Sequence, residues 1–241
     1  PAQSSPNLLF INVSPIEYGH VLLVPRVLDD LPQLVDPATM ALALRFAREA
    51  ANPFLRVGYN SLGAYATINH LHFQAYYLAA PMPCERAPTA TLHFQASKRK
   101  RAGLSAVRLS TLGDYPVRGW VLEAAVASVP GALDELAELV GTACLRMQAA
   151  NVPHNLIICD AGCRVFLWPQ CFAEKQALGQ VPAHILDTGV NPATFEIAGH
   201  LVLKRREDYE AMSQDAAWEL LEQVSLSEER FAEVTALAFG E

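Results

Sequence analysis

The sequence contains no apolar run long enough to cross a membrane. No stretch approaches the roughly 18 to 20 uninterrupted apolar residues of a spanning helix, and the first residues lack the basic end and apolar centre of a signal peptide. The chain begins at Pro1 without a methionine, so any address upstream of Pro1 lies outside this sequence. With 51% apolar residues among 241, the chain can bury a large core. We expect a soluble globular protein without a membrane partner.

Cysteine is scarce, and its distribution argues against a disulfide framework. Five scattered cysteines are an odd number in a chain large enough not to need covalent staples, which favours reduced thiols and a cytoplasmic location. The close pair in "CDAGC" at 159–163 leaves zinc open but favours two structural thiols, because no second pair of suitable spacing accompanies it. The five are Cys84, Cys144, Cys159, Cys163 and Cys171.

Most of the chain is nearly neutral. The net charge of -7 arises near the end, where residues 207–241 hold ten acidic residues and one arginine, while the first 206 residues hold 17 basic and 15 acidic ones. This balance argues against a general nucleic-acid surface and is compatible with a local basic pocket for one phosphorylated ligand. The run "SKRKR" at 97–101 favours a solvated loop, although a nuclear address or a polyanion contact has the same composition.

The first part of the chain alternates strand and helix patterns. Aliphatic runs at 7–13 and 20–24 predict two strands around the turn-rich "SPIEYG". Asp36 as N-cap and Pro37 as first helical residue predict a helix that ends near Asn52. Two strand-like runs follow in "FLRVGYNSLGAYATINHLHFQAYYL" at 54–78, and the mixed tract from Pro81 to about Arg101 indicates a long connection.

The second part repeats this order. An apolar stripe in 131–150 predicts a helix, and "NLIICDAGCRVFLWPQ" at 155–170 matches the strand, turn and strand order of residues 7–26. "DYPVRGWVLEAAV" predicts another strand, "NPATFEIAGHLVLK" a helix running into a strand or turn, and the segments after Ser213 and after Ser225 or Ser227 predict helices. We therefore predict an α+β fold of two related halves, residues 1–127 and 128–241, each an antiparallel sheet with packed helices.

The stretch "TINHLHFQAYYL" at 67–78 sets two histidines and a glutamine at alternate positions. Alternate side chains of a strand share a face, so we expect His70, His72 and Gln74 to point together while the residues between them enter the core. A zinc site would need a third and usually a fourth nitrogen, sulfur or carboxylate ligand, which glutamine supplies poorly. Histidines that are merely hydrogen-bonded at a sheet edge are the non-functional alternative.

Nucleophilic catalysis is the interpretation that gives His70, His72 and Gln74 each a role. It requires one imidazole in the neutral tautomer whose other N–H is fixed by a backbone carbonyl or a neighbouring side chain. His72, at the centre of the face, fits this nucleophile, His70 would orient it or contact phosphate, and Gln74 would donate amide hydrogens to a phosphoryl oxygen. Glutamine is no proton donor at neutral pH, so the pattern favours a leaving group and an acceptor that are stable anions, such as a sugar phosphate and inorganic phosphate.

These residues resemble the histidine-triad superfamily. "SPIEYGHVLLVP" with "YNSLGAYATINHLHFQAYYL" carries the resemblance, and Gln74 in place of a third histidine is similar to the transferase and phosphorylase branch around galactose-1-phosphate uridylyltransferase. "INVSPIEYGHVLLVPRVLDDLPQ", "PQCFAEKQALG" and "LDTGVNPATFEIAGHLVLKR" further resemble the GDP-hexose phosphorylase family, above all its plant and green-algal members. The resemblance extends over about residues 11–231 and implies two histidine-triad-like halves, of which only the first carries the active-site strand.

The resemblance implies a nucleotidyltransferase. GDP-L-galactose and phosphate would give L-galactose 1-phosphate and GDP, a step toward ascorbate, through a guanylylated His72, with GDP-D-glucose as the alternative substrate. A GDP-hexose and inorganic phosphate are the expected partners, no cofactor or metal is expected, and a homodimer is left open. Gln74 argues against a hydrolase, and the intact motif argues against a nucleotide-binding protein without catalysis. Family members generally have more sequence before the first strand, which implies that part of the nucleotide-binding surface lies there.

Further candidates for substrate binding lie around the motif and in the second half. Asn60 resembles the superfamily's asparagine near the ribose and phosphate, and Gly63 would allow close backbone approach to a ligand. His20 is expected to make a structural hydrogen bond. The full set of binding candidates is Asn60, Ser61, Gly63, Thr67, Asn69, Lys175, Gln176, Arg26 and Arg118.

Overall fold

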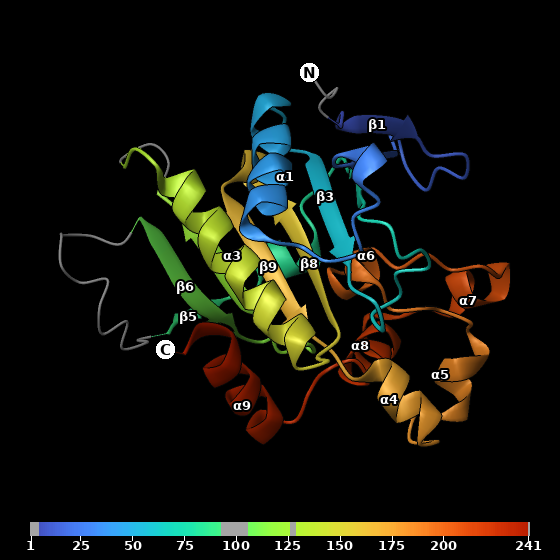
Figure 1. Ribbon diagram of the computed structural model, residues 1–241. Helices are drawn as coiled ribbons and strands as arrows, with labels where there is room; N and C mark the ends of the chain where they lie inside the picture. Colours follow the sequence, from blue (N-terminus) through green and yellow to red (C-terminus); the bar gives the residue numbers. More distant parts are fainter. Residues whose placement is uncertain (1–4, 93–105, 126–128, 241) are drawn as a thin grey trace.

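The chain folds around one continuous antiparallel sheet (Figure 1). The computed structural model describes residues 5–92, 106–125 and 129–240. Within these ranges nine strands pair in the order β1-β2-β4-β3-β8-β9-β7-β6-β5. In this order their bounds are Leu8–Ile11, Val21–Val24, Phe73–Tyr77, Leu55–Asn60, His154–Cys159, Arg164–Pro169, Trp120–Ala124, Val107–Leu112 and Thr89–Thr91.

Two long helices lie side by side on one face of the sheet (Figure 1). Helix α1 (Pro37–Glu49) begins as predicted at Asp36, which forms a reciprocal capping box with Thr39. Helix α3 (Ala132–Ala149) crosses the start of α1 at Gly141, where a Cβ would come within 2.4 Å of the Pro37 backbone nitrogen. Glycine therefore permits this close approach. Helix α9 (Glu228–Phe239), capped by Ser227, completes this layer.

Residues of several shorter helices pack on the opposite face. Helix α6 (Thr194–Ile197) lies directly on β3, because a Cβ on Gly58 would meet the Thr194 side chain at 2.5 Å. Strand residues alternate between the two layers, so the sheet has an apolar core on each side. The other short helices are α2 (Pro83–Arg86), α4 (Phe172–Ala177), α5 (Ala183–Asp187), α7 (Arg206–Ala211) and α8 (Gln214–Glu222).

The mixed helix and sheet composition confirms the expected α+β class, and several predicted segments have the predicted structure. The predicted strands at 7–13 and 20–24 are β1 and β2, the helix at 131–150 is α3, and Ser213 caps α8. The tract after Pro81 is not simply a connection, because it contains α2 and β5, while the basic run at 97–101 lies outside the described residues. Among the described helices, none has the length and apolar character that crossing a membrane requires.

Residues 155–170 form the predicted hairpin, but its place in the sheet corrects the proposed match with residues 7–26. The hairpin consists of β8 and β9, follows the long helix α3, and joins β3 at the centre of the sheet. The hairpin therefore corresponds to β3 and β4, which follow helix α1 in the same way. Residues 7–26 instead form the outer pair β1 and β2. Strands β5 to β7 precede residue 127 in the chain but join the sheet through the pairing of β7 with β9. The predicted boundary between two halves at residue 127 stays a prediction.

Candidate functional site

The His-x-His-x-Gln motif lies at the start of β4 and just before it. Because β4 begins at Phe73, the prediction of a strand over the whole motif is wrong for residues 67–72. The predicted alternation is confirmed, since buried and partly exposed residues take turns. The partly exposed ones are His70, His72 and Gln74, and the buried ones are Leu71, Phe73 and Ala75.

The His72 imidazole is held in one orientation by the backbone before it. Its Nδ1 lies 2.9 Å from the carbonyl oxygen of His70, and a carbonyl can only accept, so Nδ1 carries the hydrogen. In the neutral ring Nε2 is then the nitrogen with a free lone pair. The backbone N–H of His72 donates to Oε1 of Gln33 at 3.0 Å, which fixes the peptide as well. This arrangement is the one that a histidine nucleophile requires.

The turn after β2 approaches His70. Oδ1 of Asp30 lies 4.0 Å from Nδ1 of His70, while Nε2 of His70 is buried without a hydrogen-bond partner among the described residues. A buried ring nitrogen without a partner suits a ligand or a water molecule. Arg26 is exposed in the same turn, 3.5 Å from Asp29, and its use for phosphate binding stays a prediction.

Gln74 lies between Leu22 on β2 and Gly58 on β3. Its neighbour His20 is held, as expected, by structural hydrogen bonds: Nδ1 accepts the Ile16 N–H at 3.0 Å. Burial lowers the pKa of His20, and a side-chain hydrogen bond with Gln74 partly opposes this shift. The Gln74 amide therefore lies beside a histidine that is itself fixed by hydrogen bonds.

Tyr76 continues this face into a buried polar group that the sequence pattern did not indicate. Its hydroxyl lies 3.0 Å from Nδ1 of His200, and its ring stacks on Phe195 with 3.9 Å between centroids. Nε2 of His200 in turn lies 3.6 Å from a carboxylate oxygen of Glu17. Burial raises the pKa of Glu196, on α6, to about 7, so this carboxyl is partly protonated near neutral pH. Only the family-like block "TFEIAGH" pointed to this segment.

Asn60 and Ser61 are tied into the junction of β3 and β8. Oδ1 of Asn60 accepts Nδ2–H of Asn155 at 2.6 Å and the Thr194 N–H at 2.9 Å. Oγ of Ser61 accepts the His154 N–H at 2.8 Å. Both residues are buried, so these contacts are structural, and a role of either side chain toward substrate stays a prediction.

Three candidates lie in the loop between β3 and β4. Gly63 has a φ of +78°, a left-handed conformation that glycine adopts without strain, and a Cβ there would meet Pro153 at 3.3 Å. Thr67 and Asn69 are exposed beside the motif. Oδ1 of Asn69 accepts the Gln33 N–H at 2.9 Å, which ties the loop to the residue that holds His72.

Lys175 and Arg118 meet at one backbone segment. Nζ of Lys175, on α4, donates to the Ser225 carbonyl at 3.2 Å, and a guanidinium nitrogen of Arg118 donates to the Leu226 carbonyl at 3.0 Å. Gln176 is exposed on α4. The structure thus brings two of the predicted cations together, on a segment separate from the His72 backbone contacts.

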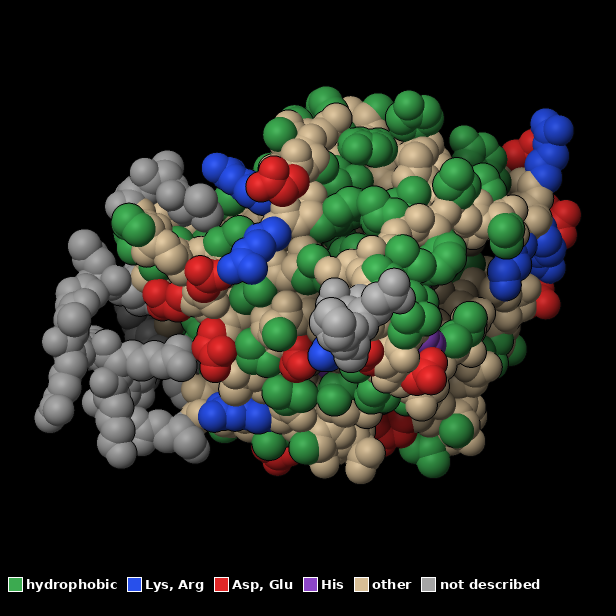
Figure 2. Space-filling view, turned by 45° about the horizontal axis from the view of Figure 1, so that its top comes forward, with side chains coloured by type: hydrophobic (Ala, Val, Ile, Leu, Met, Phe, Trp, Pro, Cys, Tyr) green, Lys and Arg blue, Asp and Glu red, His purple; other side chains and the backbone are tan. Residues whose placement is uncertain are grey.

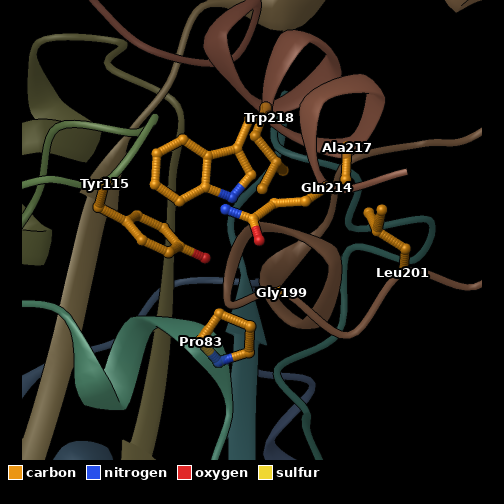
Figure 3. A pocket seen from close by; sticks show the side chains of 8 residues that line it. Pro83, Tyr115, Gly199, Leu201, Gln214, Ala217 and Trp218 are labelled. Atoms are coloured by element: carbon orange, nitrogen blue, oxygen red, sulfur yellow. The ribbon is translucent and has the colours of Figure 1, made fainter. Parts of the chain in front are cut away.

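A mostly apolar cavity of about 280 Å³ is lined by none of the motif residues (Figure 3). The rings of Tyr115 and Trp218 and the Gln214 amide face into it, and its other lining residues are apolar or glycine. None of its lining residues carries a formal charge to bind phosphate. The cavity therefore does not replace the His72 face as the candidate catalytic site.

One group of possible metal ligands occurs among the described residues, and it includes neither motif histidine. Ligand atoms of Glu85, Cys159 and Asp160 lie within 4.8 Å of one another. Both carboxylate oxygens of Glu85, however, accept hydrogen bonds from the buried Arg56 guanidinium at 2.7 and 3.0 Å. This bidentate pair already compensates the carboxylate charge, so the group is better explained as a buried ion pair.

Comparisons with known proteins show what the chain is similar to. Residues 1–76 match the family model described as "GDPGP1-like, N-terminal domain", and residues 83–241 match "GDPGP1-like, C-terminal domain". The chain is 56% identical to GDP-L-galactose phosphorylase 1 of Arabidopsis thaliana over 98% of its own length and 51% of that protein. It is 32% identical to human GDP-D-glucose phosphorylase 1, over 95% of its own length and 57% of that protein.

The fold has a solved relative at low sequence identity. Yeast Ap4A phosphorylase Apa2 in complex with Ap4A superposes with a TM-score of 0.62 at 14% identity, covering 91% of this chain and 73% of that one. This likeness concerns the fold alone. The chain spans about half the length of the curated relatives that it matches.

Proposed function

Because the chain belongs to the GDPGP1-like family, we propose that it carries GDP-L-galactose phosphorylase activity, which converts GDP-L-galactose and phosphate into L-galactose 1-phosphate and GDP. The observation that carries the proposal is the His72 imidazole. Its Nδ1–H is committed to the His70 carbonyl at 2.9 Å, which leaves Nε2 as the nucleophile. The 56% identity to an Arabidopsis protein of this name supports the substrate.

The reaction runs in two displacements at the α-phosphorus. Nε2 of His72 forms a bond to this phosphorus while the bond to the bridging oxygen breaks, and L-galactose 1-phosphate leaves as an anion. An oxygen of inorganic phosphate then attacks the guanylyl-histidine, the N–P bond breaks, and GDP leaves. Neither leaving group needs a proton from the enzyme, which suits a glutamine rather than an acid at position 74. The Gln74 amide would stabilise the developing phosphoryl charge.

Phosphate dependence tests this proposal. The chain is incubated with GDP-L-galactose with and without inorganic phosphate, and GDP, GMP and L-galactose 1-phosphate are separated. We expect multiple turnovers to GDP only when phosphate is present. Equal turnover to GMP without phosphate would identify a hydrolase and reject the phosphorylase.

GDP-D-glucose phosphorylase activity is the alternative, and the lower identity of 32% to the human protein of that name favours GDP-L-galactose. Competition between the two GDP-hexoses at equal concentration measures the ratio of their kcat/KM values directly. We expect GDP-L-galactose to be consumed first, which would place the activity in ascorbate formation.

The remaining roles are part of the same proposal. His70, through its unpartnered Nε2, would contact the phosphates, together with Thr67, Asn69 and the Gly63 backbone. The meeting of Lys175 and Arg118 would supply positive charge, and Asn60, Ser61, Gln176 and Arg26 stay weaker candidates. We further infer two histidine-triad-like halves, one with α1, β3 and β4 and one with α3, β8 and β9, joined at the β3 and β8 pair.

A homodimer and the cellular location belong to the proposal as well. The edge strand β1 offers a surface for a second copy, because Leu9, Phe10 and Ile11 are 54%, 44% and 85% exposed and the strand itself, Leu8–Ile11, contains no charged residue. Figure 2, which looks onto the end that carries β1, shows hydrophobic side chains over much of this face. Sedimentation of the wild type compared with an Ile11→Lys variant tests the proposed dimer. Imaging of a tagged chain in cells tests the proposed cytoplasmic and nuclear locations.

A further inference from the structure

The β3 and β4 ladder stops beside the nucleophile. Leu55 lies opposite Tyr77 and Gly58 opposite Gln74, and the same register continued by two places would set Asn60 opposite His72. Strand β3 does continue to Asn60, because it pairs there with Asn155 of β8. The residues just before β4 depart from β3 at this point. A group from elsewhere in the chain must therefore lie between the two segments.

The carboxamide of Gln33 occupies this gap. Its Nε2 donates to the Asn60 carbonyl at 2.9 Å, and its Oε1 accepts the His72 N–H at 3.0 Å. Nε2 also lies 3.3 Å from the His72 carbonyl oxygen. The two backbone groups that would bond each other in a continued ladder are therefore bridged by one side-chain amide.

Gln33 itself is fixed on both sides and is only 1% exposed. Its backbone N–H donates to Oδ1 of Asn69 at 2.9 Å, and its carbonyl accepts the Tyr59 hydroxyl at 2.9 Å. The amide has one workable orientation, because a flip would set its NH₂ group against the His72 N–H.

We propose that Gln33 is a positioning residue, which wedges β3 and β4 apart and fixes the His72 peptide so that the imidazole Nε2 faces the bound phosphoryl group. The inference rests on the proposed function, in which His72 is the nucleophile. An amide is required because it both accepts and donates. A carboxylate would accept the His72 N–H but would face the Asn60 and His72 carbonyl oxygens without a hydrogen, and an apolar side chain would leave all three groups unpaired.

Two variants separate positioning from support of the fold. Gln33→Leu should lower kcat by about 100-fold at every pH with little change in KM, because a small misplacement of a reacting group has an effect of this order. Gln33→Glu should be as slow at high pH but recover as the pH falls, since the protonated carboxyl has the donor and acceptor pattern of the amide. The neighbouring titratable groups His70, His72, Tyr59 and Asp30 are common to both variants, so the difference between them isolates the new carboxyl.

A matched control measures what loss of stability alone does. Leu44 is fully buried in α1, and its apolar side chain can take no part in the hydrogen bonds that hold the His72 backbone, so Leu44→Ala should lower the melting temperature while kcat and KM of the folded fraction stay at wild-type values. If the Gln33 variants keep wild-type kcat once the folded fraction is counted, or if Gln33→Glu shows no recovery at low pH, the positioning role is wrong.

Nitrogen NMR of the histidine side chains gives a readout that needs no turnover. The His72 signal is assigned by its loss in His72→Gln. We expect a pure Nδ1–H tautomer in the wild type and a mixture of tautomers in Gln33→Leu, whereas an unchanged tautomer would overturn the inference. If the wild type converts no GDP-hexose, the proposed function fails, and this spectrum alone decides on Gln33.

Discussion

Two histidines in this chain share one local geometry and differ in surroundings. Nδ1 of His72 lies 2.9 Å from the carbonyl two residues earlier, and Nδ1 of His154 lies 3.0 Å from the Val152 carbonyl, also two residues earlier. Each backbone N–H is held by a side chain, Gln33 for His72 and Ser61 for His154. Both rings are therefore fixed in the tautomer that leaves Nε2 free.

Burial separates their uses. His72 is partly exposed, whereas His154 is fully buried, its Nε2 has no partner within the described residues, and burial lowers its pKa to about 4. A nucleophile needs a free Nε2 that a substrate can reach, and only His72 meets both conditions. The comparison teaches that the backbone contact prepares the imidazole, while access decides whether it can react.

Removing the imidazole of His72, the proposed nucleophile, should have the largest effect. His72→Ala should lower kcat by about 10⁴-fold or more, because a covalent mechanism loses its nucleophile. His184→Ala is the matched control, since His184 is exposed and pairs with Glu219 on the surface. Steady-state phosphorolysis assays compare the two. Retained turnover in His72→Ala would contradict covalent catalysis at this residue.

Removing the buried ring should change the pH dependence of stability. In the folded chain His154 stays neutral until the pH approaches about 4, whereas in the unfolded chain it takes up a proton below about 6.5. Because only the unfolded chain takes up this proton, the free energy of unfolding is unaffected above pH 6.5 and falls as the pH drops toward 4. The loss amounts to about 2 kcal/mol at pH 5. Denaturant unfolding at pH 8 and pH 5 should therefore show a smaller loss in His154→Leu than in the wild type. Equal losses would mean that His154 is protonated in the folded state.

Removing the hydrogen bond from the His154 backbone N–H to Ser61 should have the smallest effect. Ser61→Ala leaves the buried His154 N–H without its acceptor, which should lower the free energy of unfolding by about 1 to 2 kcal/mol. Urea unfolding at neutral pH measures this change. An unchanged free energy of unfolding together with a raised KM would instead assign Ser61 to the substrate.

The sequence predicts those features that depend on local periodicity. The alternation of His70, His72 and Gln74 with core residues was predicted from the two-residue repeat of a strand and is observed, although β4 itself begins only at Phe73. The start of α1 follows from Asp36 and Pro37. The early end of the ladder at Gly58 and Gln74 was not predictable, because Gln33, a single glutamine in "LPQL", arrives from a separate turn. The same holds for the bonds that Asn60 makes to Asn155 and Thr194, which join residues far apart in the chain.

The most direct test of the central claim is the intact mass of the protein after mixing with GDP-L-galactose in the absence of phosphate. Covalent catalysis by His72 predicts a mass increase of one guanylyl group, which disappears when phosphate is added and is missing in His72→Gly. No adduct on the wild type under single-turnover conditions, or the same adduct on His72→Gly, would contradict it.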